Sequence, residues 1–132
     1  MREFDLKITT PDGLVFDGKA ESILLPADSG YVEIMAGHED YFATLGIGRA
    51  KLTAKGVSRL AASSGGFVLV KSGECNVVVT TLEFADEIDL ERAMTAKDDA
   101  EEMIKRASND KELVVAKAKL MRAISRIRIA EE

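Results

Sequence analysis

All ten glycines and both prolines of this 132-residue chain lie at or before Gly73, and none follows it. Glycine supplies the backbone angles that tight turns need, proline ends regular elements, and both destabilise the interior of a helix. Their segregation therefore predicts two architectures in one α+β chain. Residues 1–86 are expected to form short strands separated by turns, and residues 87–132 are expected to form a helical hairpin.

The composition is typical of a globular protein with a mostly aliphatic core, because 46% of the residues are hydrophobic and tryptophan is absent. A net charge of -5 argues against a nucleic-acid binder, whose affinity comes largely from cationic contacts to phosphates. No leader and no apolar run of roughly 18 residues is visible, so association with a membrane is expected only through a partner. The single cysteine, Cys75, cannot form an internal disulfide and is expected to be a small buried residue.

The strands are predicted from alternating apolar residues and from turn signals spaced about 8–12 residues apart, a pattern typical of an antiparallel sandwich or flattened barrel. Residues 4–8 alternate apolar and polar side chains, and residues 11–13 supply a turn. This spacing indicates about nine or ten strands. Pro26 is expected to end the strand that starts at Ala20, and residues 75–82 are expected to be one strand.

Past Phe84 the apolar residues recur at intervals of three and four, which is the spacing of one helical face. Asp86 or Asp89 can cap the first helix, and Asn109 or Asp110 can cap a second helix after a short break. Helices joined by so short a connection pack antiparallel. Their facing positions are mostly alanines, which bury little apolar area at about 0.8 kcal/mol per methyl group. We therefore expect a weakly attached hairpin that can detach from the strands.

No arrangement of side chains for catalysis or metal binding is apparent in the sequence. His38 is the only histidine, and it stands in a loop without a companion motif. One histidine and one cysteine do not make up the ligand set of a zinc site. Residues 46–48 and 65–66 are turns and not phosphate loops, because neither pair of glycines opens a helix. We therefore expect a chain that is not an enzyme by itself, with no catalytic residue and no bound metal.

Three arginines are expected to converge when the hairpin folds at the break between its helices. Arg92 and Arg126 lie equally far from this break, roughly 25 Å at a rise of about 1.5 Å per residue, and Arg122 is one turn from Arg126. The group would lie near Asp89 and Glu83. The arrangement predicts either an anion site, because guanidinium groups pair with phosphates, or a set of salt bridges on the helices.

A cationic stripe is also predicted on the last helix, where residues 110–130 carry six basic and two acidic side chains. Lys119, Arg122 and Arg126 recur at helical spacing, with Arg128 and Lys117 nearby. This stripe is either a solvated face or a docking surface for an acidic partner.

The order and spacing of several short motifs resemble the epsilon subunit of bacterial rotary, F-type ATP synthase over essentially the whole chain. The motifs are Thr10-Pro11-Asp12-Gly13, Val15-Phe16-Asp17-Gly18, Leu25-Pro26, Gly37-His38, Ser64-Gly65-Gly66-Phe67 and Ile88-Asp89-Leu90-Glu91-Arg92-Ala93. The resemblance implies a ten-stranded antiparallel β-sandwich and two C-terminal helices. It also implies a non-catalytic subunit of the central stalk, the rotor that couples proton translocation to ATP synthesis.

The partners that the resemblance implies are the gamma subunit, the ring of c subunits and the alpha/beta catalytic head. Gly30, Tyr31, His38 and Tyr41 would contact gamma and the c ring. The helices would extend into the head and inhibit ATP hydrolysis. The residues that would then contact the beta subunit are Lys119, Arg122, Arg126 and Arg128. The chain would lie peripherally at the cytoplasmic face of the bacterial plasma membrane, as part of the complex.

Some members of the family bind ATP as a regulatory ligand that holds the hairpin down, and no required cofactor is implied. The residues that this comparison assigns to nucleotide binding are Glu83, Ile88, Asp89, Arg92, Ala93, Arg122 and Arg126. Asp99 departs from the pattern, because the ATP-binding members have an arginine at this position. The alternative hypothesis is a free-standing nucleotide-binding sensor whose hairpin closes on ATP.

Overall fold

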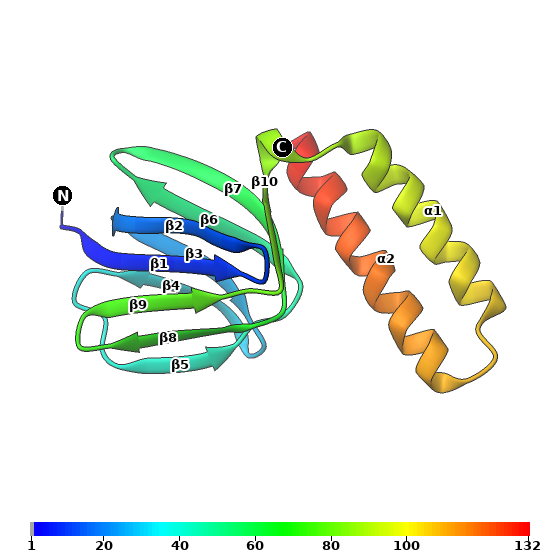
Figure 1. Cartoon of the computed structure of the whole chain (residues 1–132), viewed down its shortest axis with the longest axis horizontal. Helices are drawn as coiled ribbons and strands as arrows, with labels where there is room; N and C mark the ends of the chain where they lie inside the picture. Colours follow the sequence, from blue (N-terminus) through cyan, green and yellow to red (C-terminus); the bar gives the residue numbers. More distant parts are fainter. Residues whose placement is uncertain (1) are drawn as a thin grey trace.

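The computed structural model describes residues 2–132 and has two five-stranded sheets packed face to face, followed by two α-helices (Figure 1). The first sheet has the order β2-β1-β9-β8-β5, and the second has the order β10-β7-β6-β3-β4. The strands are β1 (Phe4–Thr10), β2 (Gly13–Ala20), β3 (Ser22–Ala27), β4 (Gly30–Met35), β5 (Tyr41–Thr44), β6 (Gly48–Ala54), β7 (Val57–Ser64), β8 (Phe67–Lys71), β9 (Glu74–Val78) and β10 (Thr81–Phe84). The ten-stranded sandwich followed by a helical hairpin, as predicted from the sequence, is confirmed.

The space between the sheets is filled by aliphatic side chains, which follow the alternation seen in the sequence. In β1, Phe4, Leu6 and Ile8 are buried in the core, whereas Asp5 and Lys7 are exposed. The cluster of buried core residues extends from Phe4 to Phe84 and includes none of the helical residues. The sandwich therefore has a hydrophobic core that does not depend on the helices.

Cys75 is part of this core, as expected, and is a free thiol. Burial raises its pKa to about 11, because the thiolate would lose its hydration in the apolar interior. The thiol is therefore protonated at neutral pH and acts as a small apolar packing residue.

Two features of the sheets depart from the expected pattern. β1 runs parallel to β9, whereas the other strand pairs of the two sheets are antiparallel. Pro26 lies inside β3, opposite Tyr31 of β4, and does not end the strand. Proline is tolerated there because β6 pairs only with residues 22–24 of β3, so the missing N–H costs no bond to β6.

The prediction of one strand over residues 75–82 was wrong, because this segment is divided between the two sheets. β9 ends at Val78 in the first sheet, and β10 begins at Thr81 in the second. Between them the Val79 N–H donates to the Thr9 carbonyl (3.0 Å) and the Thr80 N–H to the Ser64 carbonyl (3.1 Å). The backbone groups of the crossing are thus satisfied by both sheets, without a glycine or proline to mark it.

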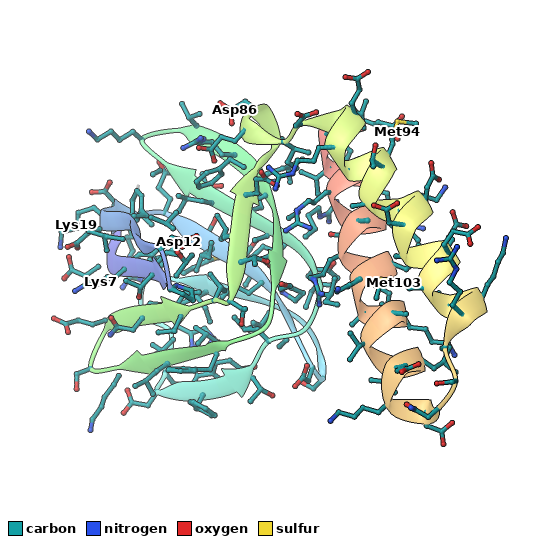
Figure 2. All side chains as sticks on the ribbon, turned by 45° about the vertical axis from the view of Figure 1, so that its right-hand side comes forward. Lys7, Asp12, Lys19, Asp86, Met94 and Met103 are labelled. Carbon is teal, nitrogen blue, oxygen red and sulfur yellow. The ribbon has the colours of Figure 1, made fainter. Side chains whose placement is uncertain are left out.

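The helical hairpin consists of α1 (Leu90–Arg106) and α2 (Asp110–Glu131), preceded by the short 3₁₀-helix η1 (Ala85–Glu87). α2 lies against one end of the sandwich, and α1 packs on its far side (Figure 1). The buried helical residues are Ala93 and Ala100 of α1 and Ala116, Ala123 and Ile129 of α2, so the expected alanine-rich packing is confirmed. Met94 points away from the sandwich on the exposed face of α1 (Figure 2). None of the helices in residues 2–132 has the length and apolar character needed to cross a membrane.

Two of the four candidate caps begin the helices. Asp89 Oδ1 accepts a hydrogen bond from the Arg92 N–H (3.1 Å), and Asn109 Oδ1 accepts one from the Glu112 N–H (2.8 Å). Each side chain satisfies a backbone donor that has no partner within its helix. Asp86, the other candidate for the first helix, lies within η1 (Figure 2).

Glu112 makes the turn between the helices dependent on pH. Its carboxylate accepts hydrogen bonds from the Ser108 N–H (2.9 Å) and the Ser108 hydroxyl (3.0 Å), which lower its pKa below the ordinary value of 4.5. A carboxyl group with a lowered folded pKa stabilises the fold above its unfolded pKa, and this contribution is lost as the pH falls through the folded pKa. We therefore expect the Ser108 amide proton to titrate in NMR spectra with a midpoint below pH 4.5, and to lose this titration in Glu112→Gln. A midpoint at or above the ordinary value would contradict these hydrogen bonds.

Candidate functional site

A cleft of about 510 Å³ opens where the helical hairpin meets the sandwich. Its walls come from the β1–β2 turn, from β10 and the residue before it, from the segment that leads through η1 into α1, and from α2. The charged residues of its lining are Asp12, Glu83, Glu87, Asp89, Arg92 and Arg126. The cleft therefore combines carboxylates with guanidinium groups drawn from both helices.

Most of the residues predicted to bind nucleotide meet in this cleft. Those that line it are Glu83, Asp89, Arg92, Ala93 and Arg126. Arg122 lies beside it and lines a small neighbouring pocket over the end of β7, which it shares with Arg126. Ile88 is half-buried just before the first cap and does not contribute to the lining. Of the three arginines that were expected to converge, two therefore lie in the cleft and the third lies next to it.

Arg126 is already engaged in the structure. Its Nε donates a hydrogen bond to Glu83 Oε1 at 3.0 Å, and the two side chains are 29% and 38% exposed. Arg92 is exposed, and among residues 2–132 no carboxylate lies within ion-pair distance of its guanidinium. The cleft therefore offers one engaged and one free arginine.

Asp12 and Glu87 are part of the cleft but were not predicted from the sequence. Glu87 Oε1 accepts a hydrogen bond from the Phe84 N–H (3.2 Å), so its spacing from Phe84 indicates a local capping role. Asp12 reaches the cleft because β1 pairs with β9, which places the β1–β2 turn next to the hairpin. No local sequence pattern carries that long-range pairing.

Polar contacts of single side chains link α2 to the sandwich, beside apolar residues such as Ile124 and Ile129 that line the crevice between them. Besides the ion pair of Arg126, Ser125 Oγ donates to the Gly48 carbonyl at 3.5 Å. Near the end of α2, Arg49 Nη1 lies 3.6 Å from Glu132 Oε1, and both side chains are 46% exposed. Exposed and long contacts of this kind contribute little to stability. The Arg126 pair is therefore the strongest polar link between α2 and the sandwich.

The residues predicted to contact gamma and the c ring lie at opposite ends of one strand. Gly30 and Tyr31 begin β4 at the end of the sandwich that faces α2, where Tyr31 lines a second crevice of about 730 Å³ against that helix. His38 follows the other end of β4, and its ring meets Tyr41 edge to face with centroids 5.5 Å apart. A partner that touches all four residues must therefore span the length of β4.

The predicted cationic stripe of α2 is divided between two environments. Lys119 and Arg128 are exposed, whereas Arg122 and Arg126 are half-buried beside the sandwich. In the attached hairpin, therefore, Lys119 and Arg128 are open to an acidic partner, as is the exposed Lys117 beside them, whereas Arg122 and Arg126 are partly covered.

Two family models match the chain, one for each part of the fold. The model described as ATP synthase, Delta/Epsilon chain, beta-sandwich domain matches residues 3–85. The model described as ATP synthase, Delta/Epsilon chain, long alpha-helix domain matches residues 86–131.

The chain is also similar to individual proteins over its whole length. An ATP synthase epsilon chain of Bacillus velezensis is 37% identical over 130 residues, which covers 98% of each chain. An ATP synthase epsilon chain of Caldicellulosiruptor saccharolyticus is 36% identical over 132 residues, which covers 100% of this chain and 96% of the relative. Among solved structures, a chain of the mitochondrial ATP synthase of Euglena gracilis superposes with a TM-score of 0.83 at 20% identity, over 98% of this chain and 82% of that chain. At this identity the structural likeness shows a shared fold.

Proposed function

The chain belongs to the family of ATP synthase delta/epsilon chains, and on this premise we propose that it is a non-catalytic rotor subunit of an F-type ATP synthase. The sandwich binds the gamma subunit and the c-subunit ring at the foot of the central stalk, and so takes part in coupling proton translocation to ATP synthesis. The hairpin restrains ATP hydrolysis in the alpha/beta catalytic head. On this proposal the chain lies at the cytoplasmic face of a bacterial plasma membrane, held there by its partners.

The observation that carries the proposal is the loose attachment of the hairpin to a sandwich with its own core. The core cluster ends at Phe84, and the buried positions of the helices are mainly alanines. An element with few apolar contacts opens at low free-energy cost while the rest of the molecule stays folded. The hairpin can therefore move as a lever while the sandwich remains bound to the stalk.

α2 is the part of the lever that would contact the catalytic head. Its Lys119 and Arg128 are exposed in the attached state, and detachment would also free Arg122 and Arg126. The released helix would then present all four cations to an acidic segment of the beta subunit. Such charge complementarity sets the orientation and the rate of docking.

The cleft supports ATP as a regulatory ligand that keeps the lever attached. Arg92 from α1 and Arg126 from α2 line the same cleft, so a phosphate chain bound between them would connect both helices to the sandwich. A ligand that binds only the attached state stabilises that state by mass action. Asp99 lies on α1 outside the cleft lining, so its carboxylate does not replace a cleft residue.

Removing residues 88–132 is expected to raise the rate of ATP hydrolysis by the reconstituted complex, because the restraining lever is lost. A restraint that raises the barrier by about 1 kcal/mol corresponds to a change of roughly fivefold in rate. The measurement compares the steady-state ATPase activity of complexes rebuilt with the full chain or with residues 1–87. Circular dichroism of the shortened chain, which keeps every core residue, checks that the sandwich is folded. Unchanged hydrolysis would refute the restraint and leave only the role in the stalk.

The alternative, a free-standing nucleotide sensor, would use the same cleft without the complex. Purification of the chain from membranes separates the two hypotheses. Alpha, beta and gamma subunits accompany a rotor subunit, whereas a free sensor is recovered without them.

A further inference from the structure

We propose that Arg59 of β7 holds η1 on the sandwich, so that the hairpin pivots at Ile88 and Asp89 when it detaches. η1 contacts both β7 and α2, so a departing hairpin either leaves this short helix behind or takes it along. The contacts of Arg59 keep it behind. The inference rests on the proposed function of the hairpin as a lever, and it names the positioning residue that sets where the lever turns.

The first observation is the contact of Arg59 with the end of β10. The guanidinium carbon of Arg59 lies 3.7 Å from the centroid of the Phe84 ring, which is within the distance of a cation–π interaction. Phe84 is 6% exposed and is the last residue along the chain that belongs to the sandwich core. Arg59 therefore covers the core at the point where the chain leaves it for η1.

The second observation is the bond from the same side chain to η1 itself. Arg59 Nη2 lies 3.4 Å from Oδ1 of Asp86, which lies within η1 (Figure 2). Phe84 lies opposite Ala61 in the antiparallel pair of β10 and β7, so a strand continued by two residues would place Asp86 opposite Arg59. η1 thus stays in line with the sheet although its backbone has left the ladder of hydrogen bonds.

The third observation is that η1 is fastened on its sandwich side. Among residues 2–132, no hydrogen bond or ion pair joins η1 to α1 or α2. Glu87 turns back to β10, where its Oε1 accepts from the Phe84 N–H (3.2 Å). Ile88 and Asp89 then have extended backbones, with φ of -75° and -84°, between η1 and the start of α1. The chain is consequently held up to Glu87 and can turn at the next two residues.

The place of the pivot sets the reach of the detached hairpin. If the chain instead unravelled from Phe84, residues 85–88 would add about 13 Å of extended chain, at roughly 3.3 Å per residue. With η1 held, only Ile88 and Asp89 separate α1 from a fixed point. The hairpin then leaves and returns to the same end of the sandwich, which is what a restraint that is applied and released requires.

Arg59→Met tests the contact, because methionine keeps an unbranched apolar stem but lacks the guanidinium group. The amides of Phe84 and Ile88 report on η1, since the first donates to Glu87 and the second to the Ala85 carbonyl (3.4 Å). Both amides are expected to exchange hydrogen roughly twofold to fivefold faster in Arg59→Met, the range that an exposed cation–π contact supports. The amides of β1 and β9 should keep the rates of the parent chain.

Arg49→Met is the matched control, because it removes the same charge from the neighbouring strand β6. Arg49 Nη1 lies 3.6 Å from Glu132 Oε1 near the end of α2, so its loss should leave the exchange of Phe84 and Ile88 unchanged. Equal acceleration by this control would show a general effect of charge. Equal acceleration of the strand amides in Arg59→Met would show that Arg59 only stabilises the sandwich. Either result overturns the proposal, as do unchanged Phe84 and Ile88 amides in Arg59→Met.

Opening the hairpin tests the pivot. Ala123→Leu crowds a buried alanine of α2 and so favours detachment, and low urea, which opens weakly held elements first, provides a second way. The amides of residues 90–131 are then expected to exchange faster while those of Phe84 and Ile88 stay slow, and adding Arg59→Met should make these two fast as well. Loss of their protection with Arg59 intact would show that η1 travels with the hairpin, and would overturn the pivot.

Both experiments use the full chain without its partners, followed by NMR. The result for Arg59 is read from the Phe84 and Ile88 amides, whereas the proposed restraint is read from ATP hydrolysis by the rebuilt complex. The pivot and the restraint can therefore fail separately.

Discussion

Replacing Gly66 with alanine is expected to lower the free energy of unfolding by at least about 4 kcal/mol, enough to unfold the sandwich. A Cβ on Gly66 would lie 1.8 Å from the Val78 carbonyl oxygen and 2.8 Å from the Val79 Cα, both of them backbone atoms. The backbone cannot move away easily, because the Gly66 carbonyl accepts from the Leu45 N–H (2.8 Å) and the Val79 N–H donates to the Thr9 carbonyl (3.0 Å). The β7–β8 turn and the crossing from β9 to β10 are therefore packed backbone on backbone.

Gly73→Ala separates this steric clash from the strain of a positive φ. Gly73 has φ +81° and Gly66 has φ +93°, but no atom lies within 4 Å of a Cβ built on Gly73. Its replacement should cost only about 1–2 kcal/mol, the strain of a left-handed alanine. Urea unfolding of the two variants, followed by circular dichroism, measures the difference. Equal losses would mean that the turn at Gly66 can shift and that the close approach is not required.

The elements whose signals are local were predictable from the sequence. Alternation placed Leu6 and Ile8 in the core, and the three-and-four spacing placed Ala100 and Ala123 between the helices. The division of residues 75–82 was not predictable, because the contacts of the crossing are to Thr9 and to the β7–β8 turn, both far away in sequence. The parallel pairing of β1 with β9 was hidden for the same reason.

In the candidate site, too, the residues placed by local helix geometry were predictable, and those placed by long-range strand pairing were not. Arg92 and Arg126 are the same number of residues from the break between the helices. Because the rise per residue in an α-helix is constant, the two arginines lie at the same level along the hairpin. Arg126 meets Glu83 because Glu83 lies near the end of β10, which leads into the hairpin at the level of these arginines. Asp12 was missed because its place depends on how two strands pair. The separation of Tyr31 from His38 was missed because β4 between them is fully extended, so nearness in sequence did not mean nearness in space.

Ala123→Leu is expected to open the hairpin and leave the sandwich intact. Ala123 is 1% exposed and is one of the alanines buried in the hairpin, so a leucine there must displace the side chains packed around it. Overpacking of this kind costs about 1–3 kcal/mol. This cost is large compared with the small free energy that we expect to keep the hairpin closed. The amides of α2 should therefore lose roughly tenfold to a hundredfold of their protection against hydrogen exchange, while those of β1 and β9 keep theirs.

Val114→Leu adds bulk to the same helix at a residue that is 66% exposed, and it should change nothing. Hydrogen exchange followed by mass spectrometry compares the two variants peptide by peptide. Faster exchange in the strands of Ala123→Leu would show that the helices and the sandwich unfold together. Unchanged exchange in α2 would show that the helices can accommodate a leucine without separating. Either result would remove the physical basis for a lever, because a restraint that can be applied and released requires a hairpin that opens before its support does.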